Sequence, residues 1–383
     1  MTPGARVAAA IIVLDQIRDG AFAEQALTAW ARGSRYAGAK DRAAVRDHVY
    51  DALRAKHSLG DGDGRALMAR LLQRDGVDLD NIFNGIGHAP DVLSEEEIAA
   101  FSMPLDLSAP ASCDIPDWLW PAWQASLGAD AVAAAQAQQT RADVFLRINQ
   151  RKGSVDDAMA MLAQDGIATA PHAHVATCLR VRDNPRRVKS SAAYLTGLVE
   201  LQDASSQRAV GLVPVGARLL DYCAGGGGKA LAFADLTDAT VFAHDIAPQR
   251  MKDLPDRAQR AGVTIRTLTS AELPGHAPFD VVFCDAPCSG SGTWRRTPDA
   301  KWRLDVDRLQ ALIAIQADVI AAAAKLVGTG GVLAYATCSV LRAENDDIID
   351  SFLAQHPGWR VALRDQVLPG PDGDGFYLCI LAR

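Results

Sequence analysis

The sequence lacks three features that would have pointed to particular classes of protein. Its 383 residues include only seven cysteines, and no two of them form a C-x-x-C pair, so neither a disulfide scaffold nor a zinc site is expected. No run of about twenty uninterrupted apolar residues occurs, which is the length that a membrane-spanning helix needs. The apolar run at 7–14 is followed at once by charged residues and makes a poor signal peptide. We therefore expect a cytoplasmic protein with no metal.

The chain also has no overall excess of positive charge, because 46 acidic residues outnumber 39 basic ones and the net charge is −7. Basic residues are nevertheless concentrated in three segments, 35–57, 176–196 and 294–303. The middle segment holds five basic residues against one acidic residue. A solvated face explains any one such segment equally well, but three of them in an acidic chain favour a polyanionic partner.

The spacing of apolar residues divides the chain into three regions. The first hundred residues have helical spacing throughout, with helices expected at 5–19, 21–32, 42–57 and 66–74 and with Asp41 as an N-cap. A proline-bearing linker at 103–116 leads into a mixed helix and strand region. From about residue 200, strand-like runs alternate with helices, which is typical of a parallel sheet covered on both faces; the runs are 218–222, 240–244, 263–267, 281–285 and 332–336. We predict domains at 1–102, 114–195 and 196–383.

Residues that follow the first two of these strands suggest a nucleotide-like ligand. Four consecutive glycines at 225–228 would let backbone N–H groups approach a ligand at a helix N-terminus. The segment is no Walker loop, because Ala230 stands where Ser or Thr is required. Asp245 follows the second strand, where doubly wound folds place an acid on a ribose hydroxyl, although capping of the next helix explains it equally well. Together these residues indicate a nucleoside-containing cofactor.

Two cysteines follow later strands of the same predicted sheet. Cys288 lies in DAPCSGSG at 285–292, and Cys338 lies in YATCS at 335–339. A single cysteine in such a place is usually a small buried hydrophobic residue. Two of them, both next to small hydroxyl residues and at one edge of the sheet, indicate thiol chemistry.

These segments together resemble a known family. CAGGGGK at 223–229, DAPCSGSG at 285–292 and TCS at 337–339 resemble the signature blocks of the Sun/RsmB-type RNA (cytosine-5) methyltransferases. The similarity continues through LQDASS at 201–206, RRTPDAKW at 295–302, EN at 344–345 and DGFYL at 374–378. The resemblance implies an α/β fold with a Rossmann-like S-adenosylmethionine-dependent methyltransferase domain, preceded by a small α+β RNA-binding domain and by an all-helical NusB-like RNA-binding domain.

The resemblance also implies a reaction, the methylation of C5 of a cytosine in RNA through a covalent adduct at C6. Cys338 is then the nucleophile, and Cys288 assists its release. Asp285 is expected to bind the N3/N4 edge of the base, and Lys229 to lower a thiol pKa or to orient the base.

Binding of S-adenosylmethionine is implied for the glycine turn and for two acids. Its methionine end is expected at Cys223, Ala224, Gly225, Gly226, Gly227, Gly228 and Lys229, with Asp245 on the ribose and Asp285 near the methyl donor. The chain departs from the family twice. Gly225 and Gly226 stand where Ala-Pro is usual, and no acid follows the third strand near the adenine, where Ser270 or Glu272 would have to substitute.

For the RNA, we expect phosphate contacts from the basic segments and no membrane partner. The residues concerned are Arg42, Arg46, Arg180, Arg295 and Arg296. The NusB-like start favours small-subunit ribosomal RNA as the substrate of a monomeric enzyme, with transfer RNA as the alternative.

Three other interpretations are tested by particular observations. A DNA cytosine-5 methyltransferase would use Cys288 as its nucleophile and would not need Cys338. An NAD-dependent oxidoreductase would leave the cysteine pair without a role. A non-catalytic RNA-binding scaffold of the same fold would retain these catalytic residues but would not transfer a methyl group.

Overall fold

The structure, a computed structural model, describes all 383 residues and divides into two compact units. The first unit comprises Met1–Arg141 together with Trp294–Leu304, and the second comprises Ala142–Thr293 and Asp305–Arg383. The domain boundaries predicted from the sequence stay a prediction.

The first unit is helical, and the four helices expected at its start are confirmed. Its helices are α1 (Pro3–Arg18), α2 (Ala23–Gly33), α3 (Ala39–Arg54), α4 (Gly64–Arg74), α5 (Glu95–Ser102), α6 (Ala109–Ser112), α7 (Trp120–Leu127), α8 (Ala131–Ala137) and α15 (Pro298–Trp302), with short 3-10 turns η1 (Leu79–Asn81), η2 (Asp117–Leu119) and η3 (Gly128–Asp130). Apolar faces of α1, α3 and α4 meet in one core, in which Val13, Val49 and Met68 are fully buried. Burial of that stripe holds the bundle together.

The N-cap predicted for α3 was wrong. Gly38 is the N-cap, and Asp41 is the third residue of the helix, where its Oδ2 accepts the Gly38 N–H at 3.1 Å. An acid at this position accepts the N–H of the N-cap residue, which is one half of a capping box, and Gly38 has no side chain to supply the other half.

A segment far along the chain, Trp294–Leu304, belongs to this helical unit. Trp302 donates its indole N–H to the Leu53 carbonyl at 2.7 Å, and Arg54 Nε donates to the Arg295 carbonyl at 2.8 Å. Trp294 stacks on Trp123 with 5.9 Å between ring centroids. The RRTPDAKW block therefore packs among helices from the start of the chain.

The second unit begins with a small antiparallel sheet of order β2-β3-β1-β4. Its elements are β1 (Phe145–Ile148), α9 (Val155–Gln164), β2 (Thr169–Pro171), β3 (Cys178–Val181), η4 (Pro185–Ser190), α10 (Ala192–Leu195) and β4 (Val199–Leu201). Leu146, Leu162 and Leu179 are fully buried between the sheet and α9. The mixed helix and strand region expected after the linker is confirmed.

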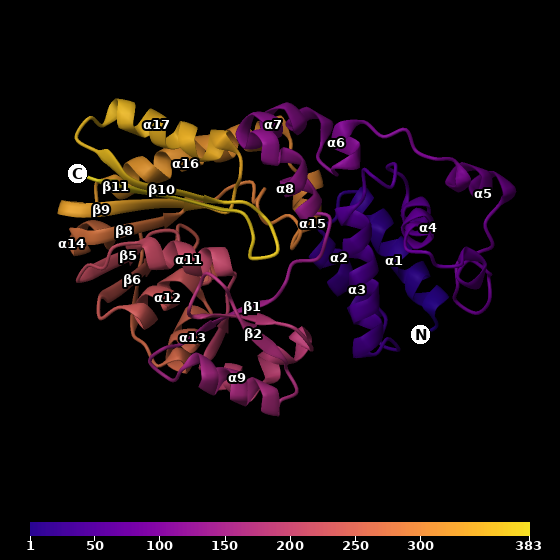
Figure 1. The fold of residues 1–383 in the computed structure, drawn as a ribbon, viewed down its shortest axis with the longest axis horizontal. Helices are drawn as coiled ribbons and strands as arrows, with labels where there is room; N and C mark the ends of the chain where they lie inside the picture. Colours follow the sequence, from indigo (N-terminus) through magenta and orange to yellow (C-terminus); the bar gives the residue numbers. More distant parts are fainter. The chain divides into compact units, whose positions relative to one another are not determined.

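The larger sheet of this unit has seven strands in the order β10-β11-β9-β8-β5-β6-β7. Its strands are β5 (Arg218–Asp221), β6 (Thr240–His244), β7 (Ile265–Leu268), β8 (Phe279–Asp285), β9 (Val327–Thr337), β10 (Arg360–Val367) and β11 (Phe376–Ala382). The helices that accompany it are α11 (Ala204–Leu212), α12 (Gly228–Leu236), η5 (Pro248–Met251), α13 (Leu254–Ala261), α14 (Leu273–His276), α16 (Val306–Ala324), η6 (Arg342–Glu344) and α17 (Asp346–Gln355). Figure 1 shows α16 and α17 on one face and α11, α12 and α13 on the other. The expected doubly covered parallel arrangement holds for β5–β9.

The last two strands are antiparallel and were not expected from the sequence. β11 pairs with β9 and β10 pairs with β11, so the chain returns as a hairpin at the edge of the sheet. β10 carries arginine and aspartate on an edge that alternates between exposed and half-buried residues, and its composition does not read as a buried strand. No helix in the structure is long and apolar enough to cross a bilayer.

Candidate active site

The predicted site residues follow the carboxyl ends of neighbouring parallel strands. β5 ends at Asp221 and leads into the glycine turn, β8 ends at Asp285, and β9 ends at Thr337, next to Cys338. Because β8 pairs with β5 on one side and β9 on the other, these strand ends lie side by side. Ligands of doubly wound sheets bind at such an edge.

A cavity of about 480 Å³ opens at this edge and brings most of the predicted residues together. It is lined by Gln202, Ser206, Asp221, Cys223, Ala224, Gly225, Gly226, Gly228, Lys229, Arg250, Asp285, Ala286, Pro287, Cys288 and Cys338. Of the predicted catalytic and cofactor residues, Gly227 and Asp245 are not in this lining. Four lining residues were not predicted as site residues: Gln202, Ser206, Asp221 and Arg250. Of these, Asp221 has a signal in the sequence, because it is the acid that ends the first parallel strand.

The two cysteines meet inside this cavity. Their Sγ atoms lie 3.4 Å apart, both cysteines are free thiols, and both are half-buried. The hydrogen bond to Cys338, reinforced by burial, raises the pKa of the Cys288 thiol well above its usual value. Either thiol can donate to the other across this contact. Thr293 Oγ1 lies 4.0 Å from the same sulfur.

Lys229 and Asp285 form an ion pair on the wall of the cavity. Lys229 Nζ lies 2.6 Å from Asp285 Oδ2. Burial by itself would lower the pKa of Lys229, but Asp285, Asp221 and Cys338 together outweigh burial and raise it. Lys229 is therefore an ammonium whose charge acts on the carboxylates and on the Cys338 thiol.

Asp221 is the least satisfied polar group of the site. Its side chain is buried, with 1% of the residue exposed, and neither carboxylate oxygen has a hydrogen-bond partner. Burial raises the pKa of Asp221 to about 7, Lys229 opposes that rise and Asp285 adds to it. A buried carboxylate without a partner is costly, and a cation bound in the cavity would supply the partner that it lacks.

The glycine turn is held in place by Asp245. Asp245 Oδ2 accepts the Gly225 N–H at 2.9 Å, Oδ1 accepts the Ala247 N–H at 2.9 Å, and Arg250 Nη1 lies 3.1 Å from Oδ2. Gly227 has φ +77°, and a Cβ atom there would come within 2.3 Å of the Leu254 side chain. Of the two roles left open for Asp245, the local one is visible in these bonds, and the ribose contact stays a prediction.

The two candidates for the missing adenine acid are engaged elsewhere. Ser270 Oγ hydrogen-bonds His244 Nε2 at 2.9 Å, and His244 Nδ1 lies 2.7 Å from the Tyr222 carbonyl. Glu272 accepts the N–H and the hydroxyl of Thr269 at 2.8 and 2.7 Å, which closes its own turn. Neither residue lines the cavity.

The arginines predicted to contact RNA have different surroundings. In the first unit Arg42 and Arg46 are exposed, and Arg46 pairs with Glu24 at 2.5 Å. Arg296 is half-buried, whereas Arg295 is buried, with 4% of its surface exposed, so its burial argues against the predicted phosphate contact.

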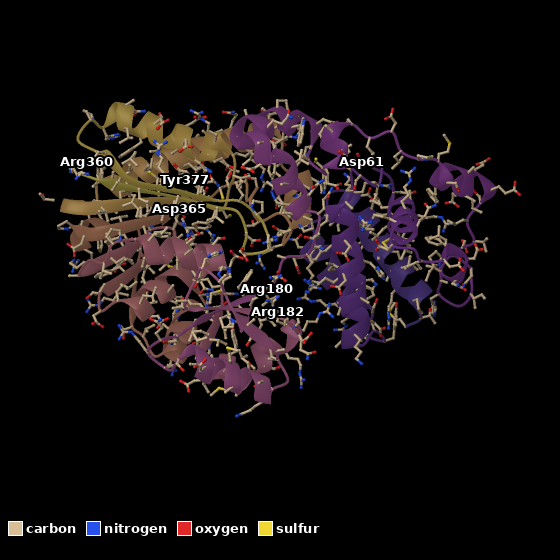
Figure 2. All side chains as sticks on the ribbon, viewed as in Figure 1. Asp61, Arg180, Arg182, Arg360, Asp365 and Tyr377 are labelled. Atoms are coloured by element: carbon tan, nitrogen blue, oxygen red, sulfur yellow. The ribbon has the colours of Figure 1, made fainter.

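In the second unit the basic residues surround strand β3. Arg180 lies on that strand and pairs with Asp143, and Arg182 follows it (Figure 2). Further along the same segment, Arg186, Arg187 and Lys189 are all exposed around η4. This cationic surface of the small sheet consists of Arg182, Arg186, Arg187 and Lys189.

Sequence comparison relates two segments of the chain to one group of proteins. Residues 212–377 match the family described as 16S rRNA methyltransferase RsmB/F, and residues 115–189 match the ferredoxin-like domain of RsmF/B-like methyltransferases. The chain is 34% identical over 285 residues to ribosomal RNA small subunit methyltransferase B of Serratia proteamaculans. That match covers 70% of this chain and 66% of the relative, just under two thirds of the relative's own length.

Solved structures show the same fold. The crystal structure of PH0851 is similar with a TM-score of 0.79 at 21% identity, over 100% of this chain and 99% of that one. A methyltransferase homologue from Pyrococcus horikoshii is similar with a TM-score of 0.60 at 22% identity, over 72% of this chain and 97% of that one. The predicted fold class, a Rossmann-like domain preceded by helices, is confirmed.

Proposed function

Because the chain belongs to the Sun/RsmB family of RNA methyltransferases, we propose that it transfers a methyl group from S-adenosylmethionine to C5 of a cytosine in small-subunit ribosomal RNA. The observation that carries the proposal is the pair of thiols 3.4 Å apart beside a cavity with a glycine turn. One sulfur alone would suffice for a structural role. Two sulfurs in contact suit a reaction that must both form and release a thioether.

The cavity residues fit the cofactor of this family. S-adenosylmethionine carries an α-ammonium and a sulfonium, and Asp221 offers a buried carboxylate whose oxygens accept no side-chain hydrogen bond. The glycine turn exposes backbone close to the same carboxylate, where side chains would obstruct a ligand. In this proposal Asp221 holds the ammonium, the turn cradles the methionine part, and Asp285 lies near the methyl. The bound cofactor supplies an electrophilic methyl group.

Cys338 is proposed as the nucleophile. Its thiolate adds to C6, so that an S–C6 bond forms and the C5–C6 π electrons become available at C5 for the methyl. The Cys288 thiol donates to the Cys338 sulfur and so favours the ionised nucleophile, as does the nearby Lys229 ammonium.

Release of the product then uses the same pair of sulfurs. The proton on C5 goes to Cys288 as its own proton passes to the departing Cys338 sulfur, and the electrons of the C5–H bond restore the C5–C6 double bond. Asp285 is proposed to accept a hydrogen bond from the N4 amino group of the base. Its ion pair with Lys229 holds the carboxylate on the wall of the cavity.

The proposed RNA contacts lie on each unit's own exposed cations. In the second unit these are the residues of the cationic surface of the small sheet, and in the first they include Arg42 and Arg46. A cytosine must leave any stack to reach both sulfurs, which costs least in a loop or a single strand.

The test is methyl transfer from labelled S-adenosylmethionine to small-subunit ribosomal RNA, with bisulfite sequencing to identify the base. Cys338→Ala is expected to abolish both methylation and the covalent protein–RNA adduct. Cys288→Ala is expected to accumulate an adduct that survives denaturation. Cys379→Ala, which removes a thiol buried in β11 away from the cavity, serves as the matched control.

Each outcome separates the alternatives. Methylation of transfer RNA alone would keep the chemistry and change the substrate. An adduct that persists in Cys338→Ala and disappears in Cys288→Ala would show that Cys288 is the nucleophile, as in a DNA cytosine-5 methyltransferase. Binding of both S-adenosylmethionine and RNA without methyl transfer would make the protein a scaffold.

A further inference from the structure

Glu344 is a fully buried carboxylate, 0% exposed, that receives hydrogen bonds from both cysteine-bearing loops. Its Oε1 accepts the Ser289 N–H at 2.7 Å, and its Oε2 accepts the hydroxyls of Ser289 and Ser339, each at 2.5 Å. Gln316 Nε2, from α16, donates to Oε1 at 3.0 Å. Ser289 is the residue after Cys288, and Ser339 is the residue after Cys338.

The protons in this cluster can be assigned without conflict. Each serine has one hydroxyl proton, and those of Ser289 and Ser339 go to Glu344. Ser291 Oγ lies 2.8 Å from Ser339 Oγ and accepts the Val340 N–H at 2.9 Å, so Ser291 donates to Ser339. In this assignment both oxygens of Glu344 act as acceptors, from two hydroxyls, one backbone N–H and one amide.

Further bonds make the two loops one rigid body around this carboxylate. The Gly292 N–H donates to the Cys338 carbonyl at 2.9 Å. Asn345, next to Glu344, accepts the Thr337 hydroxyl at 2.6 Å and donates to the Ser339 carbonyl at 3.0 Å. The two loops come from strands that end side by side, but strand pairing alone leaves the loops beyond the strands free to move apart.

We propose that Glu344 is a positioning residue that holds Cys288 and Cys338 at contact distance by binding the serine that follows each of them. The proposal deepens the function proposed above and rests on it for its catalytic consequence. Glu344 does not touch the base or the cofactor, because it is buried behind the loops and does not line the cavity. The nearby negative charge of Glu344 also contributes to the raised pKa of the Cys288 thiol.

The first test measures the spacing of the two sulfurs without RNA or cofactor. Diamide, a thiol oxidant, converts two adjacent thiols into a disulfide and is itself reduced to the hydrazine. The rate of Cys288–Cys338 disulfide formation, followed by mass spectrometry of tryptic peptides, is expected to fall about tenfold in Glu344→Gln, the effect of removing one charge-assisted hydrogen bond. Glu200→Gln is the matched control, because Glu200 is a buried carboxylate paired with Arg260 at 2.7 Å on the small sheet.

The second test measures catalysis. Glu344→Gln is expected to lower kcat by about tenfold or more while the KM values for RNA and cofactor stay within about twofold, because only the thiols are displaced. Ser289→Ala and Ser339→Ala each remove one donor without removing the charge, and they decide the question if Glu344→Gln does not fold. Each is expected to slow disulfide formation by several-fold.

Two results would overturn the proposal. The first is disulfide formation at the wild-type rate in folded Glu344→Gln, or in both serine variants if the glutamine variant does not fold. The second is an equal loss in Glu200→Gln. The disulfide measurement stands apart from the proposed reaction, so a protein that forms the disulfide as expected but methylates no RNA would refute the proposed function and leave the positioning role intact.

Discussion

The buried carboxylate of Asp221, which has no hydrogen-bond partner, is expected to make cofactor binding depend on pH. Burial raises the pKa of Asp221 to about 7 in the protein without ligand, and only its ionised form attracts an ammonium. The ionised fraction is about one eleventh at pH 6.0 and about three quarters at pH 7.5, and the apparent Kd is the intrinsic Kd divided by that fraction. We therefore expect S-adenosylhomocysteine, which has the same ammonium and no reactive methyl, to bind about eightfold more tightly at pH 7.5 than at pH 6.0.

The assay is isothermal titration calorimetry across that pH range, in which the ligand's ammonium stays protonated because the neighbouring carboxylate raises its pKa above the value of about 7.7–8.0 for a peptide α-amino group. Asp221→Asn is expected to bind more weakly at pH 7.5 and to lose most of the pH dependence. Methylthioadenosine, which lacks the amino acid part, is expected to bind with little pH dependence to both proteins. A flat profile in the wild-type protein, or the same slope in Asp221→Asn, would refute the assignment of the ammonium to Asp221.

Three further predictions concern stability and RNA. First, the pKa of Asp221 is higher in the folded than in the unfolded protein, so its contribution to stability is lost as pH rises from about 4 to 7. Asp221→Asn is therefore expected to be about 1–4 kcal/mol more stable than wild type at pH 8, as measured by urea unfolding. Equal stability of the two proteins at pH 8 would contradict this. Second, Gly227→Ala is expected to lower the free energy of unfolding by at least about 1–2 kcal/mol, because residue 227 has a φ of +77° and its Cβ would contact the Leu254 side chain. Gly211→Ala is the control, because a Cβ at residue 211 has open space and no loss of stability is expected. Equal stability of the two variants in the same unfolding assay would contradict the prediction. Third, replacement of Arg182, Arg187 and Lys189 with alanine is expected to reduce the slope of log K against log salt for RNA binding by about 0.7 for each phosphate that the variant no longer neutralises. The control is Arg360→Ala, on edge strand β10, which is expected to leave the slope unchanged (Figure 2). An unchanged slope in the triple variant would exclude this surface as an RNA contact.

Much of the cavity could be predicted because its residues follow strands that the local pattern reveals. Runs of buried residues identified β5, β6, β8 and β9, and the residues after three of them line the cavity. The same logic places Cys288 and Cys338 at one edge, since the carboxyl ends of parallel strands share an edge whatever their order. The family resemblance added roles for these residues, which stay predictions until tested.

Other features depended on contacts between distant parts of the chain. Arg295 is buried because Trp294–Leu304 packs among the helices of the first unit. No local pattern in RRTPDAKW predicts this packing. The hairpin of β10 and β11 joins the sheet through pairing with β9, although β10 by composition resembles an exposed segment. Asp41 was a good capping residue at the right end of the right helix, but a three-residue shift cannot be read from propensity alone.

The amino-acid sequence by itself determined the alternation of strands and helices, the glycine turn and the identity of the groups at the strand ends, because these are set by local spacing and by residue chemistry. Only the tertiary structure decided that two sulfurs fifty residues apart come within 3.4 Å, that Asp221 is left without a partner, and that Glu344 binds both serine-bearing loops. The distances between these groups and their removal from water depend on side chains from several strands, so they are fixed only when the strands have assembled into the sheet.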